Sequence, residues 1–455
     1  MRLQRFCFLV CLATCLMRVS VTAQPAGLPG EVRAALAEEM THALRAELLD
    51  AWYPRAVDTR YGGFLSRFDA AWQPEGSQEK MIVTQARHVW TTARAALFFP
   101  EDTTFLPMAA HGFAFLRDVM WDPEDGGFFW LVTQEGAVQP NRDGRVVKQA
   151  YGNAFGIYAL AAYYDASRDP EALRLAQAAF RWLDAHAHDP VHGGYFQFME
   201  RNGTPMRAGF QGTPPKDQNS SIHLLEAFFE LYRVWPDAEL HERLREMLLL
   251  IRDTITTGRG YLTLFAGADW RPVSYRDSSA AVRDAHLHLD HVSFGHDVET
   301  AYLMLEASEA LGGAEDARTL ASGKHMVDHA LRTGWDEDVG GLYDMGYYFR
   351  EADGITILRD TKNWWAQAEA LNTLLLMGDH FPEDPLRYHD KFVRLWTYVK
   401  TYLIDHERGG WYEGGLDKEP RHREGAKGHI WKGAYHDARS LMNCIQRLQA
   451  TPEAH

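Results

Sequence analysis

The chain has very little cysteine. Only four of its 455 residues are cysteines, and Cys7, Cys11 and Cys15 all fall near the N-terminus. If that segment is removed, Cys444 alone remains, which excludes a disulfide framework or a cysteine-ligated metal within one chain. An excess of positive charge is also lacking, because the formal net charge is −15. We therefore expect no nucleic-acid partner, and the acidic balance favours solubility.

The only marked apolar run near the N-terminus is too short to cross a membrane. It covers residues 6–17, follows two arginines and precedes the small residues at 21–23. This pattern is typical of a secretory signal peptide, here residues 1–23, and a lipoprotein signal ending at Cys15 is the alternative. The sequence thus predicts export, to the periplasm or the medium, and no membrane span after cleavage. The rest of the chain, residues 24–455, is predicted to be a single catalytic domain.

What the chain does contain is a repeated motif in which an aspartate precedes Gly-Gly and aromatic residues. It occurs as DTRYGGFL, DPEDGGFFW, DPVHGGYF, DEDVGGLY and DHERGGWY, with a degenerate copy in TTGRGYLTLF. The second glycines fall at positions 63, 127, 194, 260, 341 and 410, so the intervals are 64, 67, 66, 81 and 69 residues. Regular spacing of this kind identifies an internal repeat, which determines the architecture of the whole chain.

Each repeat is predicted to contain a small hairpin and two helices. Aromatic and branched residues around Asn-Gly, Glu-Gly or Asp-Gly follow the glycines, which is typical of hairpins. Between them lie stretches with apolar spacing near 3.6, such as Tyr151, Phe155, Tyr158 and Ala162. An open solenoid would need polar capping repeats, which are not evident. We therefore predict an all-α fold, an (α/α)6 barrel of about twelve helices with short β-hairpins at one end.

The 81-residue interval points to an insertion. The additional residues fall around Ser274–Ser293, and insertions into repeat scaffolds usually lie on the functional face. We expect a loop there that forms one wall of the site. The run from His286 to His291 has the spacing of metal ligands, but a polar loop lining the pocket is favoured. No metal and no other cofactor is predicted.

One polar or aromatic residue recurs near the start of the helix expected on the inside of each repeat. In a closed ring these residues would meet at one mouth of the barrel, and three of them are histidines, which transfer protons near neutral pH. An arginine among them would stabilise negative charge on oxygen. Together the residues favour a catalytic site over six separate structural roles. They are Arg87, Tyr151, His223, His296, Trp365 and His436, spaced by 64, 72, 73, 69 and 71 residues.

Other residues near these positions are candidates for supporting roles. Glu226 and Glu299 each lie three residues after a histidine, where a carboxylate could orient the imidazole. The same pairs are half of a metal motif, but such pairs are frequent on helices, and metal binding is not favoured. His88 is expected to be a surface or connector residue. Flat aromatic rings suited to the C–H face of a sugar, or to the core, are Tyr151, Phe155, Trp364, Trp365 and Trp431.

Several segments make the chain similar to a known family. SFGHDVETAYLMLEA, IHLLEAFFELYRVWPD, KNWWAQAEAL and WKGAYHDARSLM resemble the N-acylglucosamine 2-epimerase superfamily, in particular its cellobiose and mannose 2-epimerase branch. The likeness extends from about Glu31 to Leu448. It implies a cofactor-independent (α/α)6-barrel isomerase that epimerises an aldose at C2. It also implies a small-molecule sugar as the partner, and we expect a monomer or a weak homodimer.

The resemblance implies roles for individual residues. His296 and His436 correspond to an acid/base pair that removes and returns the C2 proton through an enediolate, and His223 to a residue that assists ring opening. Arg87 corresponds to an arginine near the carbonyl and C2 oxygens. The predicted substrate-binding residues are Tyr151, Phe155, Asn219, Glu226, Glu299, Trp365, Glu369 and Trp431.

Two departures from the family pattern bear on the substrate. Ser221 stands where cellobiose epimerases commonly have an additional histidine, and the insertion would crowd the subsite for a second sugar ring. Both favour a monosaccharide, with interconversion of D-mannose and D-glucose as the prediction. The alternatives are 2-epimerisation of cellobiose or mannobiose, aldose–ketose isomerisation, glycoside hydrolysis on an (α/α)6 barrel, and sugar binding without catalysis. A hydrolase would need two carboxylates facing one cleft.

Overall fold

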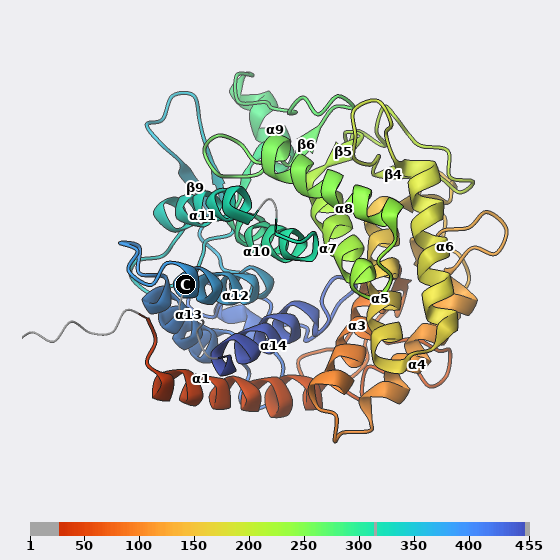
Figure 1. Cartoon of the computed structure of the whole chain (residues 1–455), viewed down its shortest axis with the longest axis horizontal. Helices are drawn as coiled ribbons and strands as arrows, with labels where there is room; N and C mark the ends of the chain where they lie inside the picture. The colour runs from red at the N-terminus through yellow and green to blue at the C-terminus, as the bar shows by residue number, and fades with distance from the viewer. Residues whose placement is uncertain (1–26, 314–315, 451–455) are drawn as a thin grey trace, which may run out of the picture.

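Six helices form a closed inner ring. The computed structural model describes residues 27–313 and 316–450, so the predicted signal peptide lies outside the described residues. Each inner helix contacts the next, and the last returns to the first, which confirms the predicted (α/α)6 barrel (Figure 1). The inner helices are α3 (Ile82–Phe98), α5 (Ala150–Ser167), α7 (Gln218–Val234), α10 (Phe294–Ala310), α12 (Trp364–His380) and α14 (Tyr435–Gln449).

An outer layer packs one helix against each inner helix. Three of the outer helices continue into π-helical turns, in which the backbone is wider than in an α-helix. The outer helices are α1 (Gly30–His42) with its extension through η1 (Ala43–Leu49) and α2 (Asp50–Trp52), α4 (Phe105–Phe115) with η2 (Leu116–Met120), α6 (Pro170–Ala187), α8 (Ala238–Leu250) with η3 (Ile251–Ile255), α11 (Asp316–Thr333) and α13 (Tyr388–Tyr402).

The residue pattern explains which helices lie inside. In α5 every residue from Ala150 to Tyr163 is buried, as expected of a helix surrounded by protein. In α6 the buried residues include Ala172, Ala176, Ala179 and Leu183, which form one stripe facing the inner ring. In these two helices, burial on all sides accompanies the inner position and a single apolar stripe accompanies the outer one.

The strands are short and lie at the end of the barrel where the inner helices begin. The named pairs join neighbouring repeats, whereas within a repeat the predicted hairpins are closed mainly by isolated bridges such as Val132 with Val138. The antiparallel pairs are β1 (Lys80–Met81) with β2 (Leu131–Val132), β3 (Val147–Gln149) with β4 (Phe198–Glu200), β5 (Lys216–Asp217) with β6 (Phe265–Ala266), and β7 (Val292–Ser293) with β8 (Met345–Tyr347), which also pairs with β9 (Thr356–Arg359).

The repeated aspartate of the Gly-Gly motif forms a buried ion pair that the sequence did not predict. Lys148 Nζ lies 2.9 Å from Asp122 Oδ2, and both side chains are fully buried. Gly127 adopts a φ of +71°, and a Cβ there would lie 2.6 Å from Trp182, so glycine is required. The motif is therefore scaffold, as predicted, and in five of its six copies the aspartate binds a lysine from the segment that precedes the next inner helix. The equivalent pairs are Lys80–Asp58, Lys216–Asp189, Lys362–Asp336 and Lys427–Asp405.

The insertion is a helix rather than the predicted loop. Residues Ala280–Asp290 form α9, which projects from the barrel beside β6 (Figure 1). Leu289 alone among its residues is buried, so α9 packs on the barrel through little of its surface. Across residues 27–313 and 316–450, no helix combines the length and the apolar character that crossing a membrane requires.

Candidate active site

The predicted residues meet in one chamber at the end of the barrel where the inner helices begin. Each inner helix places a side chain from its first two turns on the barrel axis, which confirms the convergence predicted from the repeat. The chamber has a volume of about 200 Å³ and is lined by Arg87, Tyr151, Asn219, His223, His296, Glu299, Trp364, Trp365, Trp431 and His436.

Each of the three histidines has a hydrogen-bond partner at Nδ1. His223 Nδ1 lies 2.8 Å from Glu226 Oε2, and His436 Nδ1 lies 2.5 Å from a carboxylate oxygen of Glu369. His296 Nδ1 lies 2.7 Å from the hydroxyl of Ser293. These contacts hold the ring orientations and leave Nε2 of each imidazole as the atom available to a bound molecule.

The chamber disfavours the charged form of these imidazoles. Burial lowers the pKa of His296 to about 3, and it also lowers the pKa of His223 and His436 well below the ordinary value. The nearby positive charge of Arg87 acts in the same direction on all three. A neutral imidazole can accept a proton, so each of the three is a candidate general base.

Arg87 supplies positive charge to the same chamber. Its Nη2 donates to the Tyr151 hydroxyl at 3.1 Å, and its guanidinium lies over the rings of Phe155 and Tyr435, at 4.4 and 4.9 Å from their centroids. Its Nε is buried without a hydrogen-bond partner in the described structure. The group can therefore donate to an oxygen that becomes negative during a reaction. Phe155, predicted to bind substrate, lies behind Arg87 and does not line the chamber.

A buried arginine connects the carboxylates beneath the chamber. Arg439 Nη2 donates to Glu299 at 2.6 Å and to Glu369 at 2.7 Å, and Nη1 is bonded to Glu226. Burial lowers the pKa of Arg439 to about 10, so the guanidinium still carries its charge at neutral pH. Arg439 therefore compensates three carboxylates, two of which hold a histidine of the chamber.

Three predictions about the glutamates need correction. Glu226 and Glu369 do not line the chamber but lie below it, bonded to His223 and His436. Glu299 lines the chamber but does not pair with His296, because its carboxylate bonds to Arg439. The inner helices run down into the barrel, so a residue three or four positions later lies one turn deeper.

The residues that sequence analysis missed are those that support the histidines: Arg439, Ser293 and Tyr302, whose hydroxyl donates to Glu369 at 2.7 Å. A signal for two of them was present. Arg439 lies three residues after His436, and Tyr302 three residues after Glu299, so both continue the inward-facing stripe of their helices.

A second cavity of about 300 Å³ adjoins the chamber and shares Tyr151, Asn219, His296 and Trp431 with it. His288 of α9 and His291 just after it line this cavity, so the insertion does form a wall, as predicted. Trp431 is 45% exposed and belongs to both spaces. Three residues of its lining, Asp217, Gln218 and Asn219, each have a buried side-chain oxygen without a hydrogen-bond partner in the described structure.

One group of side chains has the proximity of a metal site. Ligand atoms of Glu299, Glu369 and His436 all lie within 4.8 Å of one another. The positive charge between the two carboxylates is however supplied by Arg439, which donates to both of them. A divalent cation there would have to displace a guanidinium that cannot lose its charge readily, so the arrangement favours histidine orientation over metal binding.

His88 is buried, contrary to the sequence prediction, and this creates a pH-dependent contribution to stability. Its ring stacks on Phe64, and burial lowers its pKa from 6.5 to about 3. The unfolded chain therefore binds a proton that the folded chain does not, and stability falls as the pH decreases from 6.5 to about 3. Because one proton is involved, His88→Gln should reduce the slope of unfolding free energy against pH by about 1.4 kcal/mol per pH unit. Urea denaturation between about pH 4 and pH 6.5 measures the slope, and an identical slope in the variant would contradict the assignment.

A family model described as N-acylglucosamine 2-epimerase matches residues 62–437. The chain belongs to the N-acylglucosamine 2-epimerase family. This confirms the resemblance inferred from the sequence and the class of enzyme that it implies, an isomerase of this family.

Relatives in this family resemble the chain over nearly its whole length. A cellobiose 2-epimerase of Bacteroides fragilis is 28% identical over 418 residues, which cover 91% of this chain and 98% of that protein. A D-mannose isomerase of Thermobifida fusca is 27% identical over 372 residues, covering 80% of this chain and 85% of that protein. The structure of a cellobiose 2-epimerase from Spirochaeta thermophila superposes with a TM-score of 0.77 at 29% identity, covering 92% and 98% of the two chains.

Proposed function

We propose that this family member is a carbohydrate 2-epimerase that inverts C2 of an aldose by removing a proton from one face and returning one to the other. The epimerases and the isomerase among its relatives support this class of reaction. The observation that carries the proposal is the pair His296 and His436, whose rings lie 4.7 and 5.8 Å from the ring of Trp365 on the lining of one chamber.

The reaction follows from the groups in the chamber. His223 assists opening of the sugar ring by moving a proton between the C1 hydroxyl and the ring oxygen. One of His296 and His436 then takes the C2 proton, and the electron pair of the C–H bond forms the C1–C2 double bond of an enediolate. Arg87 donates to the oxygen that becomes negative. The other histidine, in its protonated form, delivers a proton to the opposite face of C2, and the carbonyl is restored.

The supporting groups explain why both imidazoles can act. The carboxylate of Glu369 at Nδ1 stabilises His436 when that ring becomes an imidazolium. The hydroxyl of Ser293 places no charge beside Nδ1 of His296. Two histidines with different partners are suited to opposite roles in one direction of the reaction, and the roles exchange in the other direction.

Hydrolysis is less well supported by the chamber. A glycoside hydrolase needs two carboxylates facing the substrate, whereas Glu299 is the one acidic residue on the chamber lining within the described part of the chain. The carboxylates of Glu226 and Glu369 lie below the chamber, where each is hydrogen-bonded to Arg439 and to a histidine. A TM-score of 0.55 at 11% identity with the α-mannanase BT2949 of Bacteroides thetaiotaomicron is a likeness of fold alone.

For the substrate, we propose interconversion of D-mannose and D-glucose, because the chamber of about 200 Å³ is suited to one hexose in contact with the histidines. The adjoining cavity of about 300 Å³ favours a second candidate, a β-1,4-linked disaccharide whose further ring would lie there. Its lining includes the amide side chains of Gln149, Gln197 and Asn219, and amides can hydrogen-bond to hydroxyl groups.

Separate incubations with D-mannose and with cellobiose, followed by chromatography of the sugars, test these candidates. The proposal predicts that mannose is converted to glucose with the higher kcat/KM. Faster conversion of cellobiose to its C2 epimer would favour the second candidate, and formation of fructose from mannose would show isomerisation instead. Release of monosaccharides from cellobiose would contradict the epimerase proposal.

A further inference from the structure

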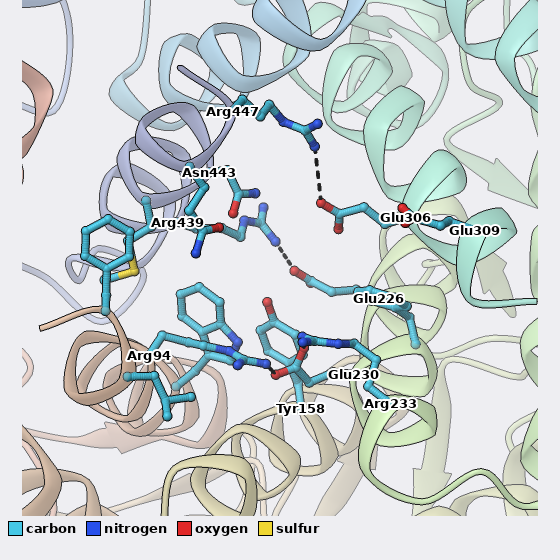
Figure 2. A pocket seen from close by; sticks show the side chains of 16 residues that line it. Arg94, Tyr158, Glu226, Glu230, Arg233, Glu306, Glu309, Arg439, Asn443 and Arg447 are labelled. Carbon is cyan, nitrogen blue, oxygen red and sulfur yellow. Dashed lines mark hydrogen bonds and ion pairs between the residues drawn. The ribbon is translucent and has the colours of Figure 1, made fainter. Parts of the chain in front are cut away.

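The largest of the described cavities lies at the end of the barrel opposite the histidines. It has a volume of about 340 Å³ and is lined by the C-terminal halves of α3, α7 and α10, by α14 from Arg439 onwards, and by Tyr158 of α5 (Figure 2). Leu97, on its lining, is 43% exposed, so the cavity reaches solvent at that side. No step of the proposed reaction uses this space.

The charges around this cavity are balanced. Figure 2 shows guanidinium groups facing carboxylates across it. Arg447 lies 3.8 Å from Glu306, and Arg233 lies 3.6 Å from Glu230. A ligand of strong single charge would meet equal numbers of attractive and repulsive groups. The charged residues of the lining are Arg94, Arg233, Arg439 and Arg447 and, opposite in sign, Glu226, Glu230, Glu306 and Glu309.

Hydrogen-bonding capacity in the cavity is unused. Trp90 Nε1 and Arg439 Nε are buried N–H donors without partners in the described structure, and both residues line the cavity. The amides of Asn443 and Gln446 add donors and acceptors at the same wall. Donors and acceptors in alternation, without net charge, match a molecule with many hydroxyl groups.

Two residues of this cavity also support the catalytic chamber. Glu226 lines the cavity through its side chain and holds His223 at Nδ1. Arg439 lines it as well and is bonded to Glu369, which holds His436. A molecule that hydrogen-bonds to either residue would alter the charge that these carboxylates present to the two histidines.

We propose that this cavity is a second binding site, for a neutral polyhydroxylated molecule of the sugar or polyol class, and that its occupation changes turnover in the chamber. The effect on turnover rests on the proposed function, whereas binding does not. The space, the balanced charge and the unpartnered donors carry the binding proposal. The shared residues Glu226 and Arg439 carry the coupling.

Binding is tested with D-glucitol, a polyol without a carbonyl group, on protein labelled with ¹⁵N at the tryptophan indoles. The indole N–H signal of Trp90, assigned with Trp90→Phe, should shift saturably on addition of D-glucitol. In Asn443→Phe, which fills the cavity, the shift should be lost. If Asn443→Phe unfolds, Arg233→Met takes its place, because it removes a charged side chain from the edge of the cavity. A Trp90 signal that does not move in the wild type, or that moves equally in both folded variants, would overturn the site.

Coupling is tested by steady-state kinetics with the same polyol. In the wild type, D-glucitol should change kcat at saturating sugar by at least about twofold, and in Asn443→Phe it should act only on KM, by competition in the chamber. Purely competitive behaviour in the wild type, or an unchanged effect on kcat in the variant, would overturn the coupling. If no sugar is turned over, the proposed function fails, and the Trp90 signal still decides binding.

Discussion

Replacing Arg439 by methionine is expected to lower the free energy of unfolding by about 3–5 kcal/mol, because it leaves buried carboxylates without their counter-charge. Glu226, Glu299 and Glu369 all bond to this guanidinium, and all three side chains are at most 3% exposed. Burial already raises the pKa of Glu299 to about 8 and that of Glu369 well above its ordinary value, and the loss of Arg439 would raise both pKa values further. Urea denaturation at pH 7 measures the effect.

Arg447→Met is the matched control on the same helix. Arg447 is 27% exposed in its side chain and lies 3.8 Å from its partner Glu306, so its removal should cost less than about 1 kcal/mol. If Arg439→Met were as stable as Arg447→Met, the buried carboxylates would not depend on the guanidinium, and the account of the support beneath the chamber would be wrong.

Alanine in place of either His296 or His436 is expected to reduce exchange of the C2 proton by a factor of about 10²–10⁴, the usual contribution of a positioned acid or base. Both rings line the chamber rather than fill the core, so the fold should be retained. The measurement is the rate of deuterium incorporation from solvent, followed by NMR of the recovered sugar. Far-ultraviolet circular dichroism and a thermal unfolding curve check the fold.

His286→Ala is the control for this pair. His286 lies on α9, where its ring stacks on Tyr275 at 4.1 Å, and it lines neither the chamber nor the adjoining cavity. Its removal should leave exchange within about twofold of the wild type, as expected for a residue outside the reacting groups. Wild-type exchange rates in both His296→Ala and His436→Ala would show that the assigned acid and base are not the reacting groups.

The barrel and its mouth could be predicted because both repeat with the chain. The glycines at positions such as 127 and 194 mark each repeat, and residues at one phase of a closed ring must face one another. The sequence therefore predicts that His223, His296 and His436 lie together. The helical form of α9 was not predictable in the same way, since it occurs once and has a single buried residue, Leu289.

The support beneath the histidines needed the structure. Helical spacing alone predicts that Glu299 lies beside His296. Its carboxylate instead accepts a hydrogen bond from Arg439, which lies on another inner helix and is 140 residues away in sequence. Similarly, the partner of His436 is Glu369, 67 residues away. Contacts between different inner helices depend on the depth of each residue along the barrel axis, and periodicity within one helix does not determine that depth.

The central claim is that two imidazoles act on opposite faces of one carbon, and the distribution of deuterium in the first turnovers tests it most directly. In D₂O, the acid delivers a deuteron to C2 of the product, whereas return of the abstracted proton regenerates unlabelled substrate. The account predicts that early product carries deuterium at C2 while the remaining substrate does not. Early product that retains the substrate's hydrogen at C2 would contradict the claim that two separate histidines act. Equal early labelling of both epimers would contradict it as well.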